Sequence, residues 1–362
     1  MHKIFICFFV LVFNPGLFCQ TTREGRVVEQ TFLAESIRNN KGGEEAMRHI
    51  SIYLPPGYDE SLERYPVIYF LHGVATDDQD MFKWIGLKDL MDKAILSGRL
   101  RPMLLVLPNS KNLYGGSFYT NSSVIGNWAD FIGRDAVAYT DKNFRTIPDR
   151  RSRGLSGHSM GGNGALKIGM LFPDVFSVVY SMSPAVLNWS HDFNLTNKAF
   201  QDISQAKSQS DILKGFDMSK AFDPQAFFAA VFTGMGRVYA PNQTAGFLQA
   251  TFPVSYQKDS AVFNIEVIKK WEANFPFNMI DDHLPALRSL VALKIDWGRN
   301  EEFPHIPATA LQFSKKLEGF GIKHFAEEYI GDHTNMLAGY DGRFYTELLP
   351  FFNTYLSSAT RR

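Results

Sequence analysis

The amino-acid sequence predicts an α/β fold with a mainly parallel central sheet flanked by helices. Three observations support this prediction. Several short runs are continuously apolar, such as Val67–His72 (VIYFLH) and Met103–Pro108 (MLLVLP), as expected of strands buried on both faces of a parallel sheet. Helical patterns lie between these runs, which is the arrangement of repeated βα units. The 362 residues, 45% of them hydrophobic, suffice for one large α/β domain.

The elements follow in order along the chain. Strand character recurs in Val27–Phe32, His49–Leu54, Val67–His72, Met103–Pro108, Ser152–His158, Phe176–Met182, Val291–Trp297 and His324–Ile330. Helical patterns occupy Leu87–Ser97, Phe131–Phe144, Gly161–Phe172, Ala308–Phe320 and Tyr345–Leu356.

The regular spacing of strands fails in one place. About a hundred residues separate Met182 from the next strand, at Val291. The stretch at about 184–287 has helical and loop character and is rich in phenylalanine and tryptophan. We expect it to be an insertion, or cap, that folds over the carboxyl edge of the sheet, where open α/β sheets bind ligands. The alternative is a second hydrophobic core without a role in ligand binding.

The first 19 residues are typical of a signal peptide. Lys3 supplies a positive charge, and the apolar run Ile4–Phe13 is too short to span a bilayer. We expect cleavage after Cys19, so that residues 20–362 form the folded domain. This predicts a secreted or periplasmic protein with no stable membrane insertion after cleavage.

Charge and cysteine content exclude several classes of function. Lysine and arginine total 37, as do aspartate and glutamate, so the balance gives no electrostatic case for nucleic acid or an anionic membrane as partner. Both cysteines, Cys7 and Cys19, lie in the predicted signal peptide, which leaves neither a disulfide nor a thiol nucleophile. No histidine or carboxylate cluster has the spacing of a metal site, so we expect no metal and no cofactor.

The pentapeptide Gly157–Gly161 (GHSMG) fits the pattern G-x-S-x-G of a nucleophile elbow. In such an elbow the backbone of Ser159 is strained so that its hydroxyl stands clear of the sheet. Side chains two residues to either side would collide with the turn, which explains the glycines. Alone, the pattern is equally compatible with a tight turn and an incidental serine. The helix and strand that follow complete the parallel βαβ unit that the elbow requires.

Further site residues follow from their positions after other strands. The N–H of Val74, just past the strand that ends at His72, and the N–H of Met160 are candidate oxyanion donors. His72 itself is expected to be structural, because it lies beside a turn glycine at a strand end. The base of a serine hydrolase comes late in the chain, which favours His333 after the last strand, with His305 as the alternative.

The acid is expected in the loop after the preceding strand, Arg299–Phe303. Glu301 and Glu302 both qualify, and Glu301 is preferred. Asp296 lies within the strand, and we expect its side chain to face away from the site.

Four motifs together resemble one family: FLHG, RGLSGHSMGG, DWGRNEEF and GDH. They are similar to those of the esterase D-like group of α/β-hydrolases, which includes feruloyl and acetylxylan esterases, S-formylglutathione hydrolases and mycolyltransferases. The resemblance runs from about His49 to Leu356 and covers the insertion poorly. It implies the α/β-hydrolase fold. It places the nucleophile on Ser159, the acid on Glu301, the base on His333 and the oxyanion donors on Val74 and Met160. Most relatives have aspartate where Glu301 stands.

These features predict an exported serine carboxylic-ester hydrolase that acts through an acyl-enzyme with a Ser-His-Glu triad. Its substrate is expected to be a small-molecule or glycan ester, such as an acyl or feruloyl ester of carbohydrate. Export argues against S-formylglutathione hydrolysis, which is intracellular chemistry in this family. One alternative is an acyltransferase that moves an acyl group to a sugar or lipid hydroxyl. A catalytically inactive glycan-binding relative and a peptidase are further alternatives.

Overall fold

The computed structural model describes residues 24–217 and 221–358. The predicted signal peptide (1–19) and both cysteines lie outside the described residues. Across the described part of the chain, every helix is too short or too polar to cross a membrane.

An eight-stranded sheet forms the centre of the molecule, with the order β1-β2-β4-β3-β7-β8-β11-β12. Its strands are β1 (Arg26–Leu33), β2 (Met47–Leu54), β3 (Val67–Leu71), β4 (Leu104–Pro108), β7 (Arg153–His158), β8 (Val178–Met182), β11 (Ala292–Gly298) and β12 (Phe325–Tyr329). Within this sheet, the pairings of β2 with β1 and β4 are antiparallel and the others are parallel. All eight strands predicted from the sequence are present, with each end within two residues of its expected position. The mainly parallel α/β fold is therefore confirmed.

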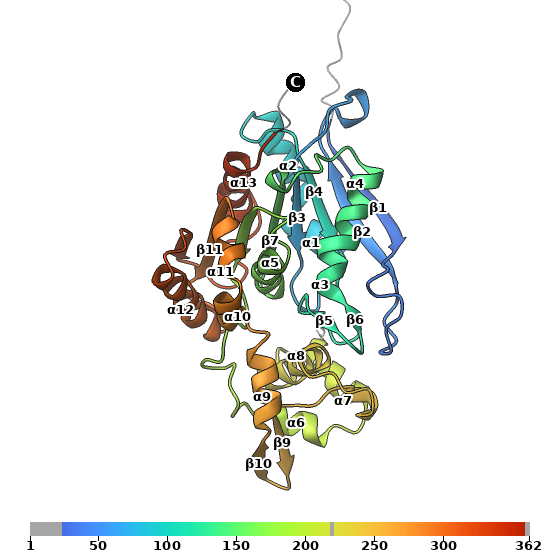
Figure 1. The fold of residues 1–362 in the computed structure, drawn as a ribbon, viewed down its shortest axis with the longest axis vertical. Helices are drawn as coiled ribbons and strands as arrows, with labels where there is room; N and C mark the ends of the chain where they lie inside the picture. Colours follow the sequence, from blue (N-terminus) through green and yellow to red (C-terminus); the bar gives the residue numbers. More distant parts are fainter. Residues whose placement is uncertain (1–23, 218–220, 359–362) are drawn as a thin grey trace, which may run out of the picture.

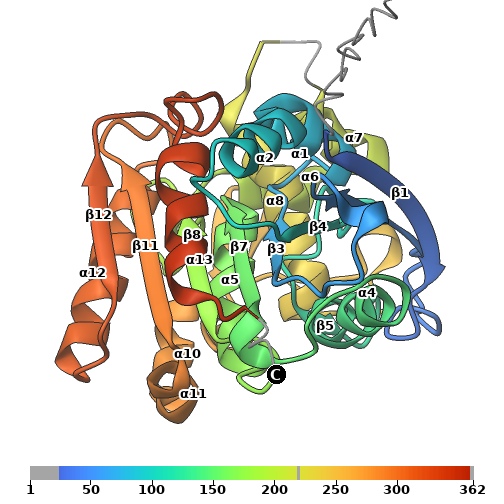
Figure 2. The ribbon, with the colours of Figure 1, turned by 90° about the horizontal axis from the view of Figure 1, so that it is seen from above.

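Helices cover both faces of this sheet (Figures 1 and 2). They include α1 (Asp78–Ile85), α2 (Leu87–Leu96), α3 (Trp128–Asp130), α4 (Val137–Asn143), α5 (Met160–Leu171), α12 (His305–Gly319) and α13 (Leu349–Tyr355). Short π-helical segments, Phe131–Ala136 and Phe344–Leu348, lead into α4 and α13. The sequence prediction missed α1, and it treated each π-helical segment and its following helix as one regular helix.

The fully buried strand β3 shows why its sequence is apolar throughout. Val67, Tyr69 and Leu71 enter the hydrophobic core that contains residues of α4, α5 and α12. Ile68 and Phe70 enter the core on the opposite face, which contains residues of α1, α2 and α13. Because successive side chains of a strand point to opposite faces, a strand between two helical layers buries both sets of side chains, which favours apolar residues at consecutive positions.

The chain between β8 and β11, residues 183–291, forms the insertion. It contains α6 (Ala199–Gln205), α7 (Gln209–Leu213), α8 (Pro224–Tyr239), the hairpin β9 (Val254–Gln257) and β10 (Ser260–Phe263), α9 (Ile265–Glu272), α10 (Pro276–Asp282) and α11 (Leu284–Ser289). Helices α6–α9 and the hairpin make a lobe at one end of the molecule, whereas α10 and α11 lie beside the main domain against α5 (Figure 1). The strands of this hairpin are not among those predicted from the sequence.

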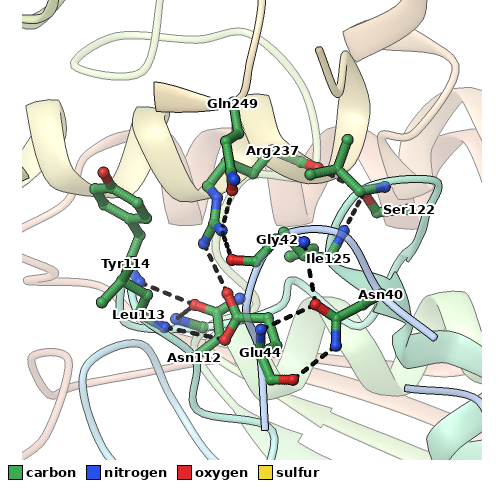
Figure 3. Close-up of polar contacts among 12 residues, drawn as sticks. Asn40, Gly42, Glu44, Asn112, Leu113, Tyr114, Ser122, Ile125, Arg237 and Gln249 are labelled. Atoms are coloured by element: carbon green, nitrogen blue, oxygen red, sulfur yellow. Dashed lines mark hydrogen bonds and ion pairs between the residues drawn. The ribbon is translucent and has the colours of Figure 1, made fainter. Parts of the chain in front are cut away.

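A buried ion pair connects the insertion to the loop between β1 and β2 (Figure 3). Arg237, on α8, lies 2.7 Å from the carboxylate of Glu44, and their side chains are only 1% and 6% exposed. The guanidinium also donates to the side chain of Gln249 and to the carbonyl of Gly42. Ser122 donates its hydroxyl to the backbone carbonyl of Arg237. The position of α8 relative to the sheet is therefore fixed by several polar contacts.

Candidate active site

The turn between β7 and α5 has the geometry of a nucleophile elbow. Ser159 stands between them with φ 60° and ψ −118°, a strained conformation for a residue with a side chain. A Cβ on Gly157 would lie 2.4 Å from the carbonyl oxygen of Gly161, and a Cβ on Gly161 would lie 1.9 Å from that of Leu71. Both glycines of the motif are therefore required by the close approach of the turn to its own backbone and to β3.

The loop after β3 lies against this elbow. A Cβ on Gly73 would be 3.6 Å from the Cβ of Ser159. The N–H groups of Val74 and Met160 form no hydrogen bond within the part of the chain that the structure describes, and both residues line one pocket with Ser159. Two backbone donors are thus available beside the serine, as in an oxyanion hole.

His72 holds this loop in place. Its Nδ1 lies 2.8 Å from the carbonyl oxygen of Gly73, and its Nε2 accepts a hydrogen bond from the N–H of Ser110 at 2.8 Å. Burial lowers the pKa of His72 to about 4, so the ring is neutral and Nδ1 carries the proton. The structural role expected for His72 is confirmed.

Two adjacent carboxylates contact His333 in different ways. Glu301, whose carboxylate is fully buried, lies 2.6 Å from Nδ1 of the His333 ring. Glu302 instead accepts a hydrogen bond from the backbone N–H of His333 at 3.1 Å. The imidazole packs edge-on against Phe303, with ring centroids 5.3 Å apart. The structure therefore places Glu301 at the ring and Glu302 at the main chain of the same histidine.

His158, at the end of β7, also contacts the loop that carries His333. Its Nε2 lies 2.7 Å from the carbonyl oxygen of His333, and the two rings are 4.6 Å apart. Burial and the neighbouring His333 lower the pKa of His158 to about 3, so it is neutral and donates this hydrogen bond. The residue just before Ser159 thereby holds the loop that carries His333.

Two other candidates from the sequence lie in different environments. His305 pairs with Asp192, with Nδ1 3.1 Å from each carboxylate oxygen. Asp296 is buried and accepts hydrogen bonds from Tyr180 at 2.6 Å and from Arg343 at 2.5 Å. These contacts make Asp296 part of the polar core beneath the site, in agreement with the expectation that it faces away.

Two cavities meet at Ser159. We call the first the slot; it has a volume of about 30 Å³, and its lining includes Val74, Met160, Phe228 and His305. We call the second the cleft; it has a volume of about 290 Å³, and its lining includes Trp84, Phe222, His333 and Thr334. Ser159 lines both, so a group bound at its hydroxyl can extend in two directions. Residues Phe227 and Phe228 of α8 border these cavities, so the insertion reaches the carboxyl edge of the sheet.

No group of three histidine, cysteine, aspartate or glutamate side chains within residues 24–217 and 221–358 is arranged to hold a metal ion.

Comparison with known proteins agrees with this architecture. A family model described as "Putative esterase" matches residues 44–334. An esterase of Mycobacterium tuberculosis is 34% identical over 152 residues, which are 40% of this chain and 31% of that protein. An endo-1,4-beta-xylanase/feruloyl esterase of Xylanibacter ruminicola is 28% identical over 164 residues, 42% of this chain and 20% of that protein. The matched regions thus span well under two thirds of these curated relatives.

Solved structures show the fold over almost the whole chain. A ferulic acid esterase superposes with a TM-score of 0.62 at 20% identity and covers 92% of this chain and 99% of its own. An S-formylglutathione hydrolase from Staphylococcus aureus superposes with a TM-score of 0.55 at 14% identity, with 91% and 99% covered. The chain therefore belongs to the Putative esterase family and has the α/β-hydrolase fold.

Proposed function

We propose that the protein hydrolyses carboxylic esters, with Ser159 as nucleophile, His333 as general base and Glu301 as the acid that orients it. The observation that carries this proposal is the pairing of Glu301 with Nδ1 of His333 in the cleft that Ser159 also lines. A carboxylate at Nδ1 keeps the proton on that nitrogen and leaves Nε2 free to accept one. Family membership and the names of the relatives support the same chemistry.

The proposed reaction has two steps. His333 takes the hydroxyl proton of Ser159 as the oxygen attacks the ester carbonyl, and the N–H groups of Val74 and Met160 stabilise the resulting oxyanion. His333 then gives this proton to the departing alkoxide, and an acyl-enzyme remains. Water, deprotonated by His333, attacks the acyl-enzyme in the same way, which releases the carboxylic acid and restores Ser159.

The two cavities then receive different parts of the substrate. Because His333 protonates the leaving alcohol, the cleft that it lines takes the alcohol portion of the ester. The slot, whose lining includes both oxyanion donors, takes the part of the acyl group next to the ester carbonyl, because its volume of about 30 Å³ holds only a few atoms. Trp84 and Phe222 in the cleft are 45% and 57% exposed and offer aromatic faces to a sugar ring. This favours acyl or feruloyl esters of carbohydrate, together with small esters, as substrates.

Replacement of Ser159 or His333 by alanine tests the proposal. Either change should lower kcat by at least about a thousandfold, because the members of a catalytic triad act as a unit. The assay is a panel of p-nitrophenyl acyl esters, methyl ferulate and acetylated xylan, with labelling by a fluorophosphonate probe. Full activity or undiminished labelling in Ser159→Ala would exclude the proposed nucleophile. A wild-type protein that neither turns over the panel nor reacts with the probe would favour the glycan-binding alternative.

Acyl transfer to a sugar or lipid hydroxyl is the second candidate. The mainly apolar lining of the cleft favours it, since side chains such as Met81, Trp84 and Phe216 would exclude water and hold an alcohol. Partitioning of the acyl-enzyme between water and added alcohols distinguishes the two reactions.

The proposal also includes export, which the apolar run Ile4–Phe13 supports. Fractionation of cells that express the full chain would test it.

A further inference from the structure

His305 lies at the start of α12, inside a cluster of aromatic rings. Its ring centroid is 5.5 Å from that of Phe193 and 6.2 Å from that of Phe303, and the residue is only 2% exposed. Asp192, from the insertion, accepts a hydrogen bond from the backbone N–H of His305 at 2.8 Å. Its two carboxylate oxygens each lie 3.1 Å from Nδ1 of the ring. Asp192 therefore fixes the orientation of the imidazole and keeps the proton on Nδ1.

The opposite ring nitrogen, Nε2, is left as an acceptor. It is buried, and it has no hydrogen-bond partner among the residues that the structure describes. The same imidazole lines the slot beside Ser159, where its other neighbours, such as Phe118, Val186 and Val231, are apolar. Buried polar atoms are nearly always paired, so an oriented acceptor without a partner, in a residue that lines a candidate substrate pocket, is a candidate contact for a polar group of the substrate.

We propose that Nε2 of His305 accepts a hydrogen bond from a hydroxyl group on the acyl portion of the substrate. The enzyme then prefers esters of hydroxylated acids, aliphatic or aromatic, over the matching esters without the hydroxyl. This inference rests on the proposed function, because the slot is assigned to the acyl group through the role of His333. His305 is the specificity-determining residue, and Asp192 is its positioning residue. A pocket that pairs with a substrate hydroxyl discriminates strongly against an analogue that lacks it, since the pocket atom is then left unpaired.

Two matched pairs of esters test this preference, and they also tell which class of acyl group the slot accepts. One pair is p-nitrophenyl 3-hydroxybutyrate and p-nitrophenyl butyrate, and the other is methyl 4-hydroxycinnamate and methyl cinnamate. For at least one pair, kcat/KM of the wild-type enzyme should be at least about tenfold higher with the hydroxyl. The pair that shows the preference tells whether the natural acyl group is aliphatic or aromatic. In His305→Leu, which removes the acceptor, this ratio should fall to about one.

Two variants separate hydrogen bonding from pocket shape. Asp192→Asn can donate to Nδ1 and so favours the tautomer with the proton on Nε2, which should also lower the ratio. This variant keeps the imidazole and serves as a second test where His305→Leu does not fold. Val231→Ala changes the volume of the slot without removing a polar atom, so both esters of a pair should change in the same direction and the ratio should persist.

The outcomes that overturn the inference are distinct from those that overturn the proposed function. Equal kcat/KM values for both pairs in the wild type, or an unchanged ratio in His305→Leu, would exclude a hydroxyl contact at His305. Loss of all turnover in His305→Leu, to the level of His333→Ala, would make His305 the base instead. Calorimetry measures the affinity of Ser159→Ala for each ester of the same pairs, and so gives the preference for the hydroxyl in the absence of turnover. An inactive wild type that still binds the hydroxylated ester more tightly would therefore refute hydrolysis alone, whereas equal binding would refute the role of His305.

Discussion

At the scale of single residues, two adjacent glutamates in the loop after β11, Glu301 and Glu302, make different contacts with the same histidine. Glu301 turns inward to the ring of His333, and Glu302 accepts from the backbone N–H of the same residue. The N–H of Gly298 lies 3.4 Å from the second carboxylate oxygen of Glu301, and this contact helps to hold that oxygen in place. Under the proposed mechanism, the first carboxylate controls the tautomer of the base and the second controls only its position.

Amide variants at these two positions should therefore differ in effect. Glu301→Gln can donate to Nδ1 and so favours the wrong tautomer of His333, and it should lower kcat by about a thousandfold or more. Glu302→Gln retains an oxygen that can accept from the N–H of His333, and it should lower kcat by less than about tenfold. Steady-state kinetics with a p-nitrophenyl ester measure both. The reverse order of effects would assign the acid to Glu302.

The candidate residues that could be named from the sequence are those fixed by local pattern or by chain order. Ser159 is marked by its flanking glycines, and His333 by its place after the last strand. The contact between His158 and His333 joins residues 175 positions apart. The pairing of Asp192 with His305 spans 113 positions and depends on how the insertion folds. No periodicity or motif carries such information, because these contacts are set by tertiary packing.

At the scale of elements, helix α8 connects the insertion to the site. Phe227, Phe228 and Val231 of this helix line the slot, whereas Phe232 and Tyr239 pack against Trp271 of α9 within the lobe. The aromatic residues of the insertion thus serve both roles considered from the sequence, a hydrophobic core and a pocket wall. The same helix carries Arg237, whose buried pair with Glu44 joins α8 to the loop between β1 and β2 (Figure 3).

Removal of one partner of this pair should be strongly destabilising. Arg237→Met leaves the carboxylate of Glu44 buried without its cation, and the free energy of unfolding should fall by about 3–5 kcal/mol. The double variant Arg237→Met, Glu44→Leu should recover most of this loss, since it leaves no unpaired charge. Urea unfolding curves give both values.

An exposed ion pair provides the control. The side chains of Arg26 and Asp59 are 51% and 62% exposed, so Asp59→Asn should change the free energy of unfolding by less than about 1 kcal/mol. A loss of similar size in Arg237→Met and Asp59→Asn would show that burial of the Arg237–Glu44 pair has no energetic consequence.

At the scale of the whole molecule, the strands of the sheet could be predicted from the sequence, whereas the insertion could be located but its fold could not. A parallel strand between two helical layers has side chains buried on both faces, and where it is apolar throughout, as in β3, its burial is visible in a few consecutive residues. The insertion has no such internal layer. All four residues of its hairpin strand β10 (Ser-Ala-Val-Phe) are exposed, so this strand has no buried face that a sequence pattern could reveal. The fold of the insertion depends on contacts with distant segments such as the loop that carries Glu44.

Lys167 connects three parts of the molecule: its own helix α5, the loop that contains Phe118 and Thr120, and the end of α8. It lies on α5 and is fully buried, where its amino group donates to Thr120 and to the carbonyl of Phe118 and lies 3.4 Å from the hydroxyl of Tyr239 at the end of α8. Burial lowers the pKa of Lys167 from the ordinary 10.5 to about 7. The folded protein therefore loses this proton at a much lower pH than the unfolded chain does.

The stability of the wild-type protein should consequently rise with pH above 7 relative to a variant that lacks this amine. Between pH 7 and pH 10.5 the unfolded chain holds a proton on Lys167 that the folded protein has released, so the free energy of unfolding gains about 1.4 kcal/mol per pH unit from this group. Below pH 7 Lys167 is protonated in both the folded and the unfolded protein, so it no longer makes the free energy of unfolding depend on pH. Urea unfolding of the wild type and of Lys167→Met at pH 7, 8 and 9 isolates this slope, because all other titrating groups are common to both proteins. Parallel pH profiles would mean that Lys167 keeps its proton in the folded state, and that its hydrogen bonds hold an ammonium group rather than a neutral amine between the sheet and the insertion.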